Sequence, residues 1–389
     1  MSIYVLVSGD FTPLGGMDSA NHALAKELAL REGTEVHLVT HRAWPDLTAL
    51  PNVIVHKVPK LLGSYLVSGP VLAGAGRYWA KRHTRLGARV LVNGGNCLWD
   101  DMNWVHYVHA AYTPQTNGGL FHRLKVRAGH AYCCHTERIS LRNARLIVTN
   151  SKRTKRDVID RLGVPADRVH AVYYGIDPDI YRPVTDTERA AARRRLGWPE
   201  TRPIVAFIGA LGHDRNKGFD VLFSAWESLC KDSAWDVDLV AAGGGAEVDL
   251  WRIRSTAAGL SDRLRMVGFI KQIPDVLAAA DALVSPTHYD AYGLSVQEAL
   301  CCGLPAFVTR SAGVAERYPG NLADLLLSDP PNTADLVQRL RRWRSDMSGY
   351  SARVAHFSAT LRQRTWTDMA REIVDLLRVS PRSLRRIAT

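Results

Sequence analysis

The chain has 389 residues, of which 46% are hydrophobic and 23% charged, and its formal net charge is +12. This length favours two α/β domains over a single core, and the composition excludes a disordered or fibrous chain. No apolar run reaches the ~18 to 20 residues that a membrane-spanning helix needs, and residues 1–8 lack the basic start of a signal peptide. We therefore expect the protein to stay in the cytoplasm.

The cysteines give no sign of a disulfide framework or a zinc site. There is no C-x-x-C motif, and no histidine has the spacing from a cysteine that is typical of zinc ligands. We expect the thiols to be reduced and to lie in cores or helices, and we predict no bound metal. The six cysteines are Cys97, Cys133, Cys134, Cys230, Cys301 and Cys302.

The first elements predicted are a strand over residues 3–8 and a helix over residues 17–31, whose apolar residues recur on one face. Gly15 and Gly16 lie in the loop between them. Paired glycines before a helix let backbone amides come close to a phosphate or a sugar. The simpler interpretation is a βα turn that needs a positive φ.

Further strands are predicted over residues 35–40, 53–58 and 89–92, so the first hundred residues alternate β and α as a Rossmann-like domain does. Residues 104–109 also alternate, and His106 and His109 lie near the end of this expected strand. A histidine there is either a hydrogen-bonded structural residue or a site residue.

A basic stretch follows between residues 121 and 156, in which Glu137 is the only acidic residue. Such a stretch fits an anionic membrane surface, a phosphorylated acceptor, nucleic acid, or simply a solvated face. No nucleic-acid-binding motif accompanies it, so we expect no nucleic-acid partner. Its basic residues are Arg123, Lys125, Arg127, Arg138, Arg142, Arg145, Lys152, Arg153, Lys155 and Arg156.

Prolines punctuate residues 178–203, and we place the domain boundary there. A second domain then opens with a strand over residues 204–209, a loop that contains Arg215 and Lys217, and a helix from residue 219. This arrangement suits a diphosphate, although the spacing of a Walker P-loop is absent. The glycines at 243–245 also lack the spacing of a dinucleotide-binding fingerprint.

Residues 282–309 predict a βαβ unit, with a strand, a helix over residues 295–302 and a second strand. Asp290 lies in its loop and Glu298 on its helix, and the loop 292–294 leads into the helix N-terminus. Two carboxylates beside a helix N-terminus suit a polyhydroxylated ligand that carries a phosphate. Read without further context, the same residues also fit a solvated loop acid and a surface helix acid.

The whole phrase from residue 282 to 309 resembles the signature of the GT-B glycosyltransferase family 4, which runs roughly P-S-x-x-E-x-F-G-L-x-x-x-E-A-x-x-x-G-x-P-V. One departure is that Asp290 stands where the family usually has Glu. Another is that Ala210 stands where the family usually has an Arg, and we suggest that Arg215 replaces it. The matching residues are Ser285-Pro286, Tyr292-Gly293-Leu294, Glu298-Ala299, Gly303 and Pro305.

The resemblance implies two Rossmann-like domains facing a cleft. It implies an acceptor-binding domain over residues 1–185 and a domain for the nucleotide sugar over residues 186–365, with a last helix over residues 366–389 that returns to the first domain. The implied enzyme is a hexosyltransferase that transfers sugar from a nucleotide diphosphate sugar, such as a UDP- or GDP-sugar, with retained configuration. The acceptor would be a glycan, a glycolipid or a small molecule, and no metal or other cofactor is expected.

The resemblance also implies roles for individual residues. The expected catalytic residues are Asp290, His109, Lys217 and Arg215. The expected donor-binding residues are Gly15, Gly16, Lys217, Arg215, Gly268, Phe269, Tyr292, Gly293, Leu294 and Glu298.

Two other classes of protein remain open at this point, and a metal-dependent transferase is discounted. A metal-dependent transferase needs a D-x-D motif, and Asp177-Pro178-Asp179 and Asp236-Val237-Asp238 both have that string, but the first lies in the approach to the linker and the second begins a strand. A non-catalytic sugar- or nucleotide-binding relative would explain the departure at Asp290. An NAD-dependent enzyme is disfavoured by the missing fingerprint.

Overall fold

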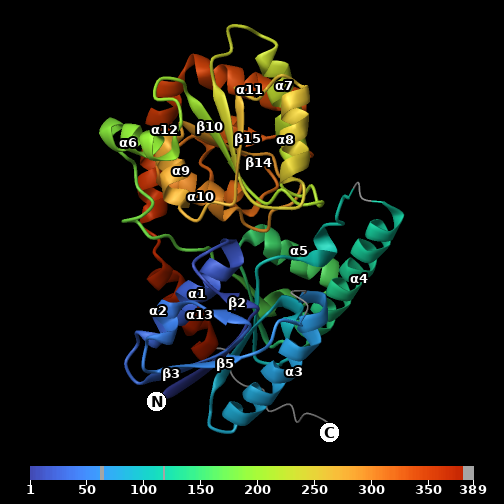
Figure 1. Ribbon diagram of the computed structural model, residues 1–389. Helices are drawn as coiled ribbons and strands as arrows, with labels where there is room; N and C mark the ends of the chain where they lie inside the picture. The colour runs from blue at the N-terminus through green and yellow to red at the C-terminus, as the bar shows by residue number, and fades with distance from the viewer. Residues whose placement is uncertain (62–64, 117–118, 380–389) are drawn as a thin grey trace. The chain divides into compact units, whose positions relative to one another are not determined.

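The computed structural model describes residues 1–61, 65–116 and 119–379 and divides into two compact units (Figure 1). The first unit comprises residues 1–113, 127–175 and 365–389, and the second comprises residues 114–126 and 176–364. The sequence places the boundary after residue 185, whereas the chain changes unit after Gly175. Ile176 is 1% exposed in the core of the second unit, a contact that the proline pattern could not reveal. Residues 380–389 of the expected returning helix lie outside the described residues.

The first unit is built on a parallel sheet. In the described part of the chain this sheet has seven strands, and the order reverses between β1 and β6, as in a Rossmann-like domain. The order is β5 (Val53–Lys57), β3 (Thr34–Thr40), β1 (Ser2–Val7), β6 (Arg89–Asn93), β7 (Met102–Val105), β8 (Leu146–Thr149) and β9 (Val169–Ala171). A short pair, β2 (Asp10–Phe11) and β4 (Arg42–Ala43), lies apart from it.

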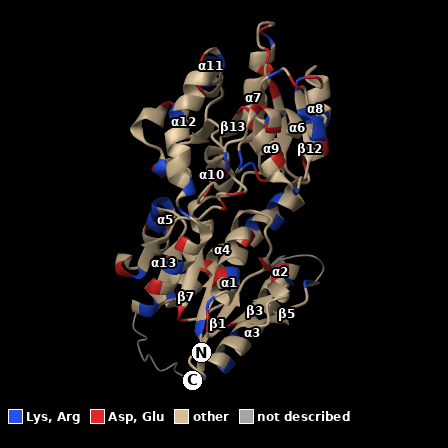
Figure 2. Ribbon diagram, turned by 90° about the vertical axis from the view of Figure 1, so that its left-hand side faces the viewer, with Lys and Arg blue, Asp and Glu red and all other residues tan. Residues whose placement is uncertain are grey.

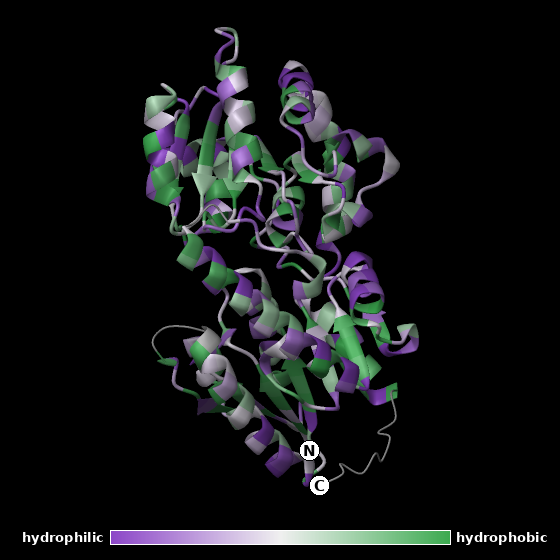
Figure 3. Ribbon diagram, turned by 90° about the vertical axis from the view of Figure 1, so that its right-hand side faces the viewer, coloured by the Kyte–Doolittle hydropathy of each residue, from purple (hydrophilic) through white to green (hydrophobic). Residues whose placement is uncertain are grey.

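Helices connect and cover these strands. Because parallel strands are joined by crossovers, the sheet is buried and its strands are nearly continuous in apolar residues, which appear green in Figure 3. The helices of this unit include α1 (Gly16–Ala29), α2 (Pro45–Thr48), α3 (Tyr65–Thr84), α5 (Lys152–Leu162) and α13 (Trp366–Val379). A long helix, α4 (Leu120–Asn143), contributes its residues from Arg127 onward.

The last helix belongs to the first unit, as the resemblance implies. α13 packs against α1 and buries Met369, Ile373 and Leu377. The chain leaves this unit at Gly175 and re-enters it at Thr365, and the two points lie backbone against backbone. A Cβ atom on Gly175 would stand 2.3 Å from the carbonyl of Thr365, so only glycine fits there.

The second unit has the same plan. Its sheet, counted over the described residues, has six parallel strands, and the order reverses between β10 and β13. The order is β12 (Leu264–Gly268), β11 (Asp238–Ala242), β10 (Ile204–Ile208), β13 (Ala282–Ser285), β14 (Ala306–Thr309) and β15 (Leu326–Leu327). Its helices are α6 (Asp186–Leu196), α7 (Phe219–Cys230), α8 (Val248–Ala257), α9 (Ile273–Ala279), α10 (Leu294–Cys301), α11 (Thr333–Ser345) and α12 (Met347–Arg362).

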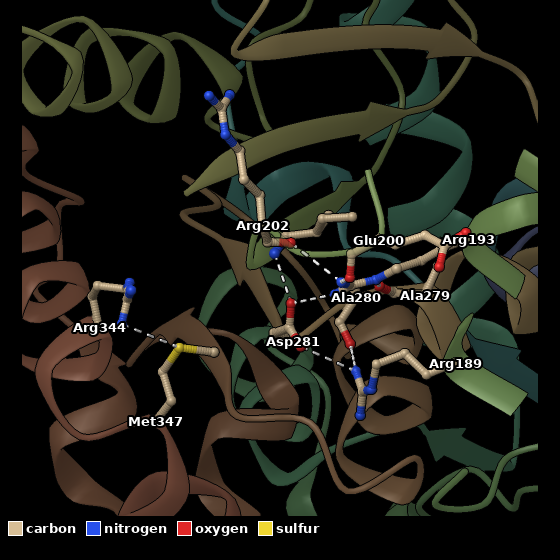
Figure 4. Close-up of polar contacts among 10 residues, drawn as sticks. Arg189, Arg193, Glu200, Arg202, Ala279, Ala280, Asp281, Arg344 and Met347 are labelled. Atoms are coloured by element: carbon tan, nitrogen blue, oxygen red, sulfur yellow. Dashed lines mark hydrogen bonds and ion pairs between the residues drawn. The ribbon is translucent and has the colours of Figure 1, made fainter. Parts of the chain in front are cut away.

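An ion pair between the buried Arg193 and the partly buried Asp281 attaches α6 to the start of this sheet (Figure 4). The Asp281 carboxylate accepts hydrogen bonds from the backbone N–H of Ile204 at 2.7 Å and from the Arg193 guanidinium at 2.6 Å. Arg193 is 5% exposed and also donates to the carbonyl of Ala279 at 3.0 Å. Because both charges are paired and hydrogen-bonded, their burial is tolerated, and the strands β10 and β13 begin in fixed register.

The expected mixed α/β fold with two Rossmann-like units is confirmed, and most boundaries agree with the sequence within two residues. The exception is the segment after β7. Residues 106–109 do not continue the strand: β7 ends at Val105, and His109 begins a 3-10 turn, η3 (His109–Ala111). The alternation was misleading because Val108 is buried in the core beneath this turn rather than in the sheet.

Candidate active site

The loops that follow β10 and β13 define the candidate site in the second unit. The strand order reverses between these neighbouring strands, and ligands of open α/β sheets bind outside the carboxyl ends at such a point. The loops are packed backbone on backbone. A Cβ atom on Gly218, whose φ is +67°, would stand 1.8 Å from the carbonyl oxygen of Pro286, so a side chain there would separate the two loops.

Lys217 and Asp290 come together between these loops. The Lys217 Nζ donates to Asp290 Oδ2 at 2.7 Å, and both side chains are only partly exposed. The second oxygen of Asp290 accepts from the backbone N–H of Tyr292 at 3.3 Å. Lys217 and Asp290 are far apart in the sequence, and the fold brings the two predicted catalytic residues into direct contact. The pair therefore offers a cation and an anion side by side at the carboxyl edge of the sheet.

Arg215, the other predicted cation, is engaged elsewhere in the same loop. Its guanidinium pairs with Asp220 at 3.4 Å, and its backbone N–H donates to the carbonyl of Gln115. Asp220 is also 3.9 Å from the Nε2 of His288, and these partners hold the pKa of Asp220 below its usual value against the effect of burial. A ligand that uses Arg215 has to compete with Asp220, which sequence reasoning did not foresee.

The loop that contains Asp290 is held by a buried hydroxyl network. Tyr292 is 2% exposed and donates its hydroxyl to Gln297, which also accepts from Arg317 at 2.8 Å. Gly293 follows with a φ of +100° and caps the N-terminus of α10, and Leu294 opens that helix. The network explains why Tyr replaces the Phe of the family signature here, because the added hydroxyl has two partners.

Thr287 links the two site loops through hydrogen bonds of its hydroxyl. Its hydroxyl donates to the carbonyl of Asn216 at 2.6 Å and is 2.8 Å from the carbonyl of Tyr289, and the residue is 1% exposed. Sequence reasoning missed Thr287, Gln297 and Arg317. The signal for Thr287 was its place directly after Pro286, whereas nothing in the sequence pointed to Arg317, whose contact depends on tertiary folding.

Glu298 lies on α10, and the pKa of its carboxyl group is higher than that of an ordinary glutamate. Burial raises its pKa to about 7, although the hydrogen bond with Tyr181 acts in the opposite direction. Burial, together with the contact with Glu298, raises the pKa of the Tyr181 phenol far above its usual range. A carboxyl group at this helix position, half ionised near neutral pH, can accept hydrogen bonds from a polyol.

Gly268 and Phe269 lie at the end of β12, on the same edge of the sheet. Gly268 has a φ of +72°, and its carbonyl accepts from the backbone N–H of Gly243 at 2.8 Å. Phe269 follows the strand and is 65% exposed. An exposed aromatic ring at this edge has an open face on which a flat heteroaromatic group can stack.

The remaining predicted residues lie in the first unit. Gly15, with a φ of +86°, precedes α1, which starts at Gly16, and a Cβ atom on Gly15 would meet nothing within 4 Å. His109 opens the η3 turn after β7, and burial together with the nearby His130 lowers its pKa to about 4. Its imidazole is thus neutral at physiological pH. His106 is 8% exposed and bonded to the Tyr174 hydroxyl at 2.5 Å, which marks it as a structural residue.

Three aspartates of the two D-x-D strings have structural partners. Asp177 accepts from the backbone N–H groups of Asp179 and Ile180 in a turn. Asp236 pairs with Arg344 at 2.5 Å, and Asp238 pairs with Arg263 at 3.1 Å. Over the residues that the structure describes, no group of three or more His, Cys, Asp or Glu side chains is arranged to hold a metal ion.

The basic stretch falls on α4 and α5, where Lys and Arg colour α5 in Figure 2. Exposed apolar side chains lie among the charges on α4: Phe121 is 84% exposed and Leu124 is 55% exposed. None of the helices in the described part of the chain is long and apolar enough to cross a membrane.

Comparisons with known proteins show the family and the fold of the chain. The profile described as "Glycosyl transferases group 1" matches residues 188–356, and the profile described as "Glycosyltransferase Family 4" matches residues 14–180. Together they account for most of the chain. The chain belongs to glycosyltransferase family 4.

Curated relatives are similar to the chain over part of their length. The chain is 27% identical to a D-inositol 3-phosphate glycosyltransferase of Corynebacterium jeikeium, over 62% of this chain and 59% of the relative. It is 31% identical to a 2-deoxystreptamine N-acetyl-D-glucosaminyltransferase of Streptomyces fradiae, over 57% of this chain and 49% of the relative. These matches span about half to three fifths of the relatives.

Solved structures show the same fold along nearly the whole chain. WaaG, a glycosyltransferase involved in lipopolysaccharide biosynthesis, has a TM-score of 0.77 at 18% identity and covers 96% of this chain and 99% of its own. HepE of Anabaena in complex with UDP and glucose has a TM-score of 0.70 at 17% identity and covers 97% and 100%. The GT-B fold that the sequence implied is thus confirmed for a family 4 chain.

Proposed function

We propose that this protein is a retaining glycosyltransferase that moves a hexose from a nucleotide diphosphate sugar to a hydroxyl acceptor. The observation that carries the proposal is the 2.7 Å contact between Lys217 and Asp290 at the switch point of the second sheet. Lys217 provides a cation that can bind a diphosphate, and Asp290 provides a carboxylate that can bind a sugar. The two lie in contact at the edge of the sheet where this class of fold binds its ligands.

The leaving group sets the main chemical demand. Negative charge grows on the diphosphate as the glycosidic bond breaks, and a preorganised cation that meets this charge lowers the barrier. Lys217 is the group for this role, with the N-terminus of α7 beginning directly after Gly218. Arg215 adds a second charge once it exchanges Asp220 for the phosphate. No metal ion has a part in this proposal.

The rest of the donor is assigned to the same edge of the second unit. Asp290 accepts hydroxyl groups of the sugar, and Tyr292, Gly293 and Leu294 place backbone amides at the α10 N-terminus. Glu298 accepts the two ribose hydroxyls. The base, uracil or guanine, stacks beside Gly268 and Phe269, whose ring is exposed for it.

The acceptor is assigned to the first unit. In this proposal Gly15 and Gly16 present the N-terminus of α1 to the acceptor, and His109 acts on the transferred sugar as a neutral imidazole. A glycan, a glycolipid or a small molecule such as a cyclitol fits the proposal. Similar proteins include enzymes named for inositol phosphate and for 2-deoxystreptamine, and the class of product is cell-surface polysaccharide, lipid-linked glycan or a small glycoside.

A panel of UDP-, GDP- and ADP-sugars tests the donor. We expect slow hydrolysis of one UDP- or GDP-sugar, release of the sugar with its original anomeric configuration by NMR, and unchanged rates in EDTA. Lys217→Ala is the control that removes turnover without removing the fold. Tight nucleotide binding with no hydrolysis and no transfer to any acceptor would instead indicate a non-catalytic relative.

A further inference from the structure

Glu137 is a buried carboxylate that the proposed chemistry does not use. It lies on α4 and is 1% exposed, and no Lys or Arg among the described residues forms an ion pair with it. A buried carboxylate without a cation is costly, so its presence calls for an explanation beyond packing.

The partners of this carboxylate are two backbone amides of the turn that carries His109. Glu137 Oε1 accepts from the N–H of His109 at 3.0 Å, and Oε2 accepts from the N–H of Ala110 at 3.2 Å. The η3 turn has no side-chain cap of its own, because Val108 precedes it. Glu137 therefore caps the turn from a different element and fixes its first two residues.

The neighbouring loop is shaped to let Glu137 approach. Gly95 lies in the 3-10 turn η2 (Gly94–Asn96) after β6, and a Cβ atom on it would stand 2.6 Å from the Thr136 hydroxyl and 3.0 Å from the backbone nitrogen of Glu137. Any larger residue would push α4 away from the sheet edge. This close approach is independent of the hydrogen bonds and depends on the same place in the fold.

We propose that Glu137 is a positioning residue for His109. Its carboxylate accepts hydrogen bonds from both N–H groups of the turn and thereby fixes the orientation of the His109 imidazole for sugar transfer. The inference rests on the proposed function, in which His109 lies beside the transferred sugar. Glu137 touches no substrate in this arrangement and acts only through the turn.

The protonation state of Glu137 then matters near neutral pH. Burial raises its pKa to about 7, against the two N–H bonds, and the Asp157 charge on α5 raises it further. The thiols of Cys133 and Cys134 on α4 also interact with it, and His109 opens the turn that it caps. Burial lowers the pKa of His109 and raises the pKa of both thiols, so these three are uncharged at neutral pH. A protonated Glu137 has one oxygen that donates instead of accepting, so one amide of the turn loses its partner.

The test is a comparison of Glu137→Gln with the parent enzyme. The amide side chain reproduces the protonated acid, because only one of its two groups can accept. We expect kcat of Glu137→Gln at pH 8 to be about 10-fold lower, with an unchanged dissociation constant for the nucleotide, which binds the second unit. We also expect kcat of the parent to rise between pH 6 and 8 and that of the variant to stay flat.

Asp157→Asn is the matched control. It removes the charge that helps to raise the Glu137 pKa and leaves the carboxylate in place, so the rise in kcat should move to lower pH. A kcat of Glu137→Gln within twofold of the parent at pH 8 would overturn the proposal, and so would an equal loss of nucleotide affinity.

Hydrogen exchange separates this inference from the proposed function. Amides of residues 106–112 should exchange faster in Glu137→Gln than in the parent at pH 8, whether or not a donor has been found. Unchanged exchange overturns the positioning role. If exchange is faster but no nucleotide sugar is turned over, Glu137 still caps the η3 turn. The transferase function, and with it the role of His109 in sugar transfer, would then be rejected.

Discussion

At the scale of single residues, Lys217 tests the charge stabilisation of the leaving group. Lys217→Ala removes an ammonium whose contact strengthens as the diphosphate departs, so kcat should fall by about 10² or more. Lys217→Arg keeps the charge but not the compact geometry and should recover only part of the rate. Steady-state kinetics with the donor found by the panel measure both, and an unchanged kcat in a folded Lys217→Ala protein would remove Lys217 from the mechanism.

Asp290 separates turnover from nucleotide binding. Asp290→Asn keeps the shape but removes the negative charge beside Lys217, so we expect turnover to fall much more than nucleotide affinity. Asp290→Glu restores the commoner residue of the family but crowds a loop in which Asp290 is already 2.7 Å from Lys217, and it should be partly active. Transfer by Asp290→Asn at the parental rate would mean that the carboxylate is only a partner of Lys217.

Glu298 is expected to contribute to nucleotide affinity rather than to kcat. Losing charge-assisted bonds to two ribose hydroxyls in Glu298→Ala should cost about 1.5 to 3 kcal/mol of binding free energy. Because the folded pKa is about 7, the accepting carboxylate form increases between pH 6 and 8, and nucleotide affinity should increase with it. Calorimetry measures both effects. A pH-independent affinity in the parent would assign Glu298 a purely structural role with Tyr181.

At the scale of elements, three histidines join β3, β5 and α3 in the first unit. His37 Nδ1 lies 2.9 Å from His56 Nε2, and the other nitrogen of His37 lies 2.8 Å from Glu35. His56 stacks on Trp79 with ring centroids 3.6 Å apart, and the His83 ring lies 3.8 Å from that of His37. Burial lowers the pKa of His37 and lowers that of His56 to about 4.

These shifts predict acid sensitivity of the first unit. The unfolded chain binds protons at a histidine pKa of about 6.5, so between pH 6.5 and 4 it takes up more protons than the folded chain. The free energy of unfolding is therefore highest above pH 6.5 and falls as the pH decreases toward 4. Discounting for the partial exposure of His56, we expect a loss of about 1 to 2 kcal/mol, or several degrees in Tm, between pH 7.5 and 5.

Thermal unfolding followed by circular dichroism at several pH values measures this loss. His56→Phe keeps a ring against Trp79 but cannot titrate, so it should flatten the dependence of Tm on pH. The matched control is His356→Phe on α12, where the histidine is exposed. The same slope in His56→Phe and in the parent would contradict the interpretation.

The elements also show what the sequence could and could not predict. Apolar runs and glycine positions predicted the strands β1, β10, β13 and β14 nearly to the residue, because buried parallel strands have a strong local pattern. The resemblance to family 4 predicted that Lys217 and Asp290 belong to the same site. The η3 turn was missed because its partner Glu137 is distant in sequence and lies within a basic stretch. The contact of Arg215 with Asp220 was missed although the two are only five residues apart, because it depends on how the loop places their side chains.

At the scale of the whole molecule, the net positive charge and the basic residues of α4 and α5 predict how the protein behaves at a lipid surface. The net charge is +12, and the basic residues of α4 and α5 are mostly exposed. α4 also carries the exposed side chains of Phe121 and Leu124. Each Lys or Arg near an anionic surface contributes about 1 kcal/mol, and this attraction is screened by salt. We expect weak, salt-sensitive attachment to anionic membrane, which would bring a lipid-linked acceptor near the enzyme.

Co-sedimentation with phosphatidylserine-containing vesicles at low salt tests this attachment. Arg123→Ala/Lys125→Ala should reduce the bound fraction several-fold at low salt. Phe121→Ser should reduce the part of the binding that persists at higher salt, because the Phe121 ring contributes apolar area rather than charge. Arg194→Ala/Arg195→Ala on α6 is the control with the same change in net charge, and its side chains are also more than half exposed. If the two double variants bind equally, total charge alone explains the attraction and α4 has no special role. If the parent does not bind anionic vesicles at all, the acceptor must reach the enzyme from solution, which favours a small-molecule glycoside as the product.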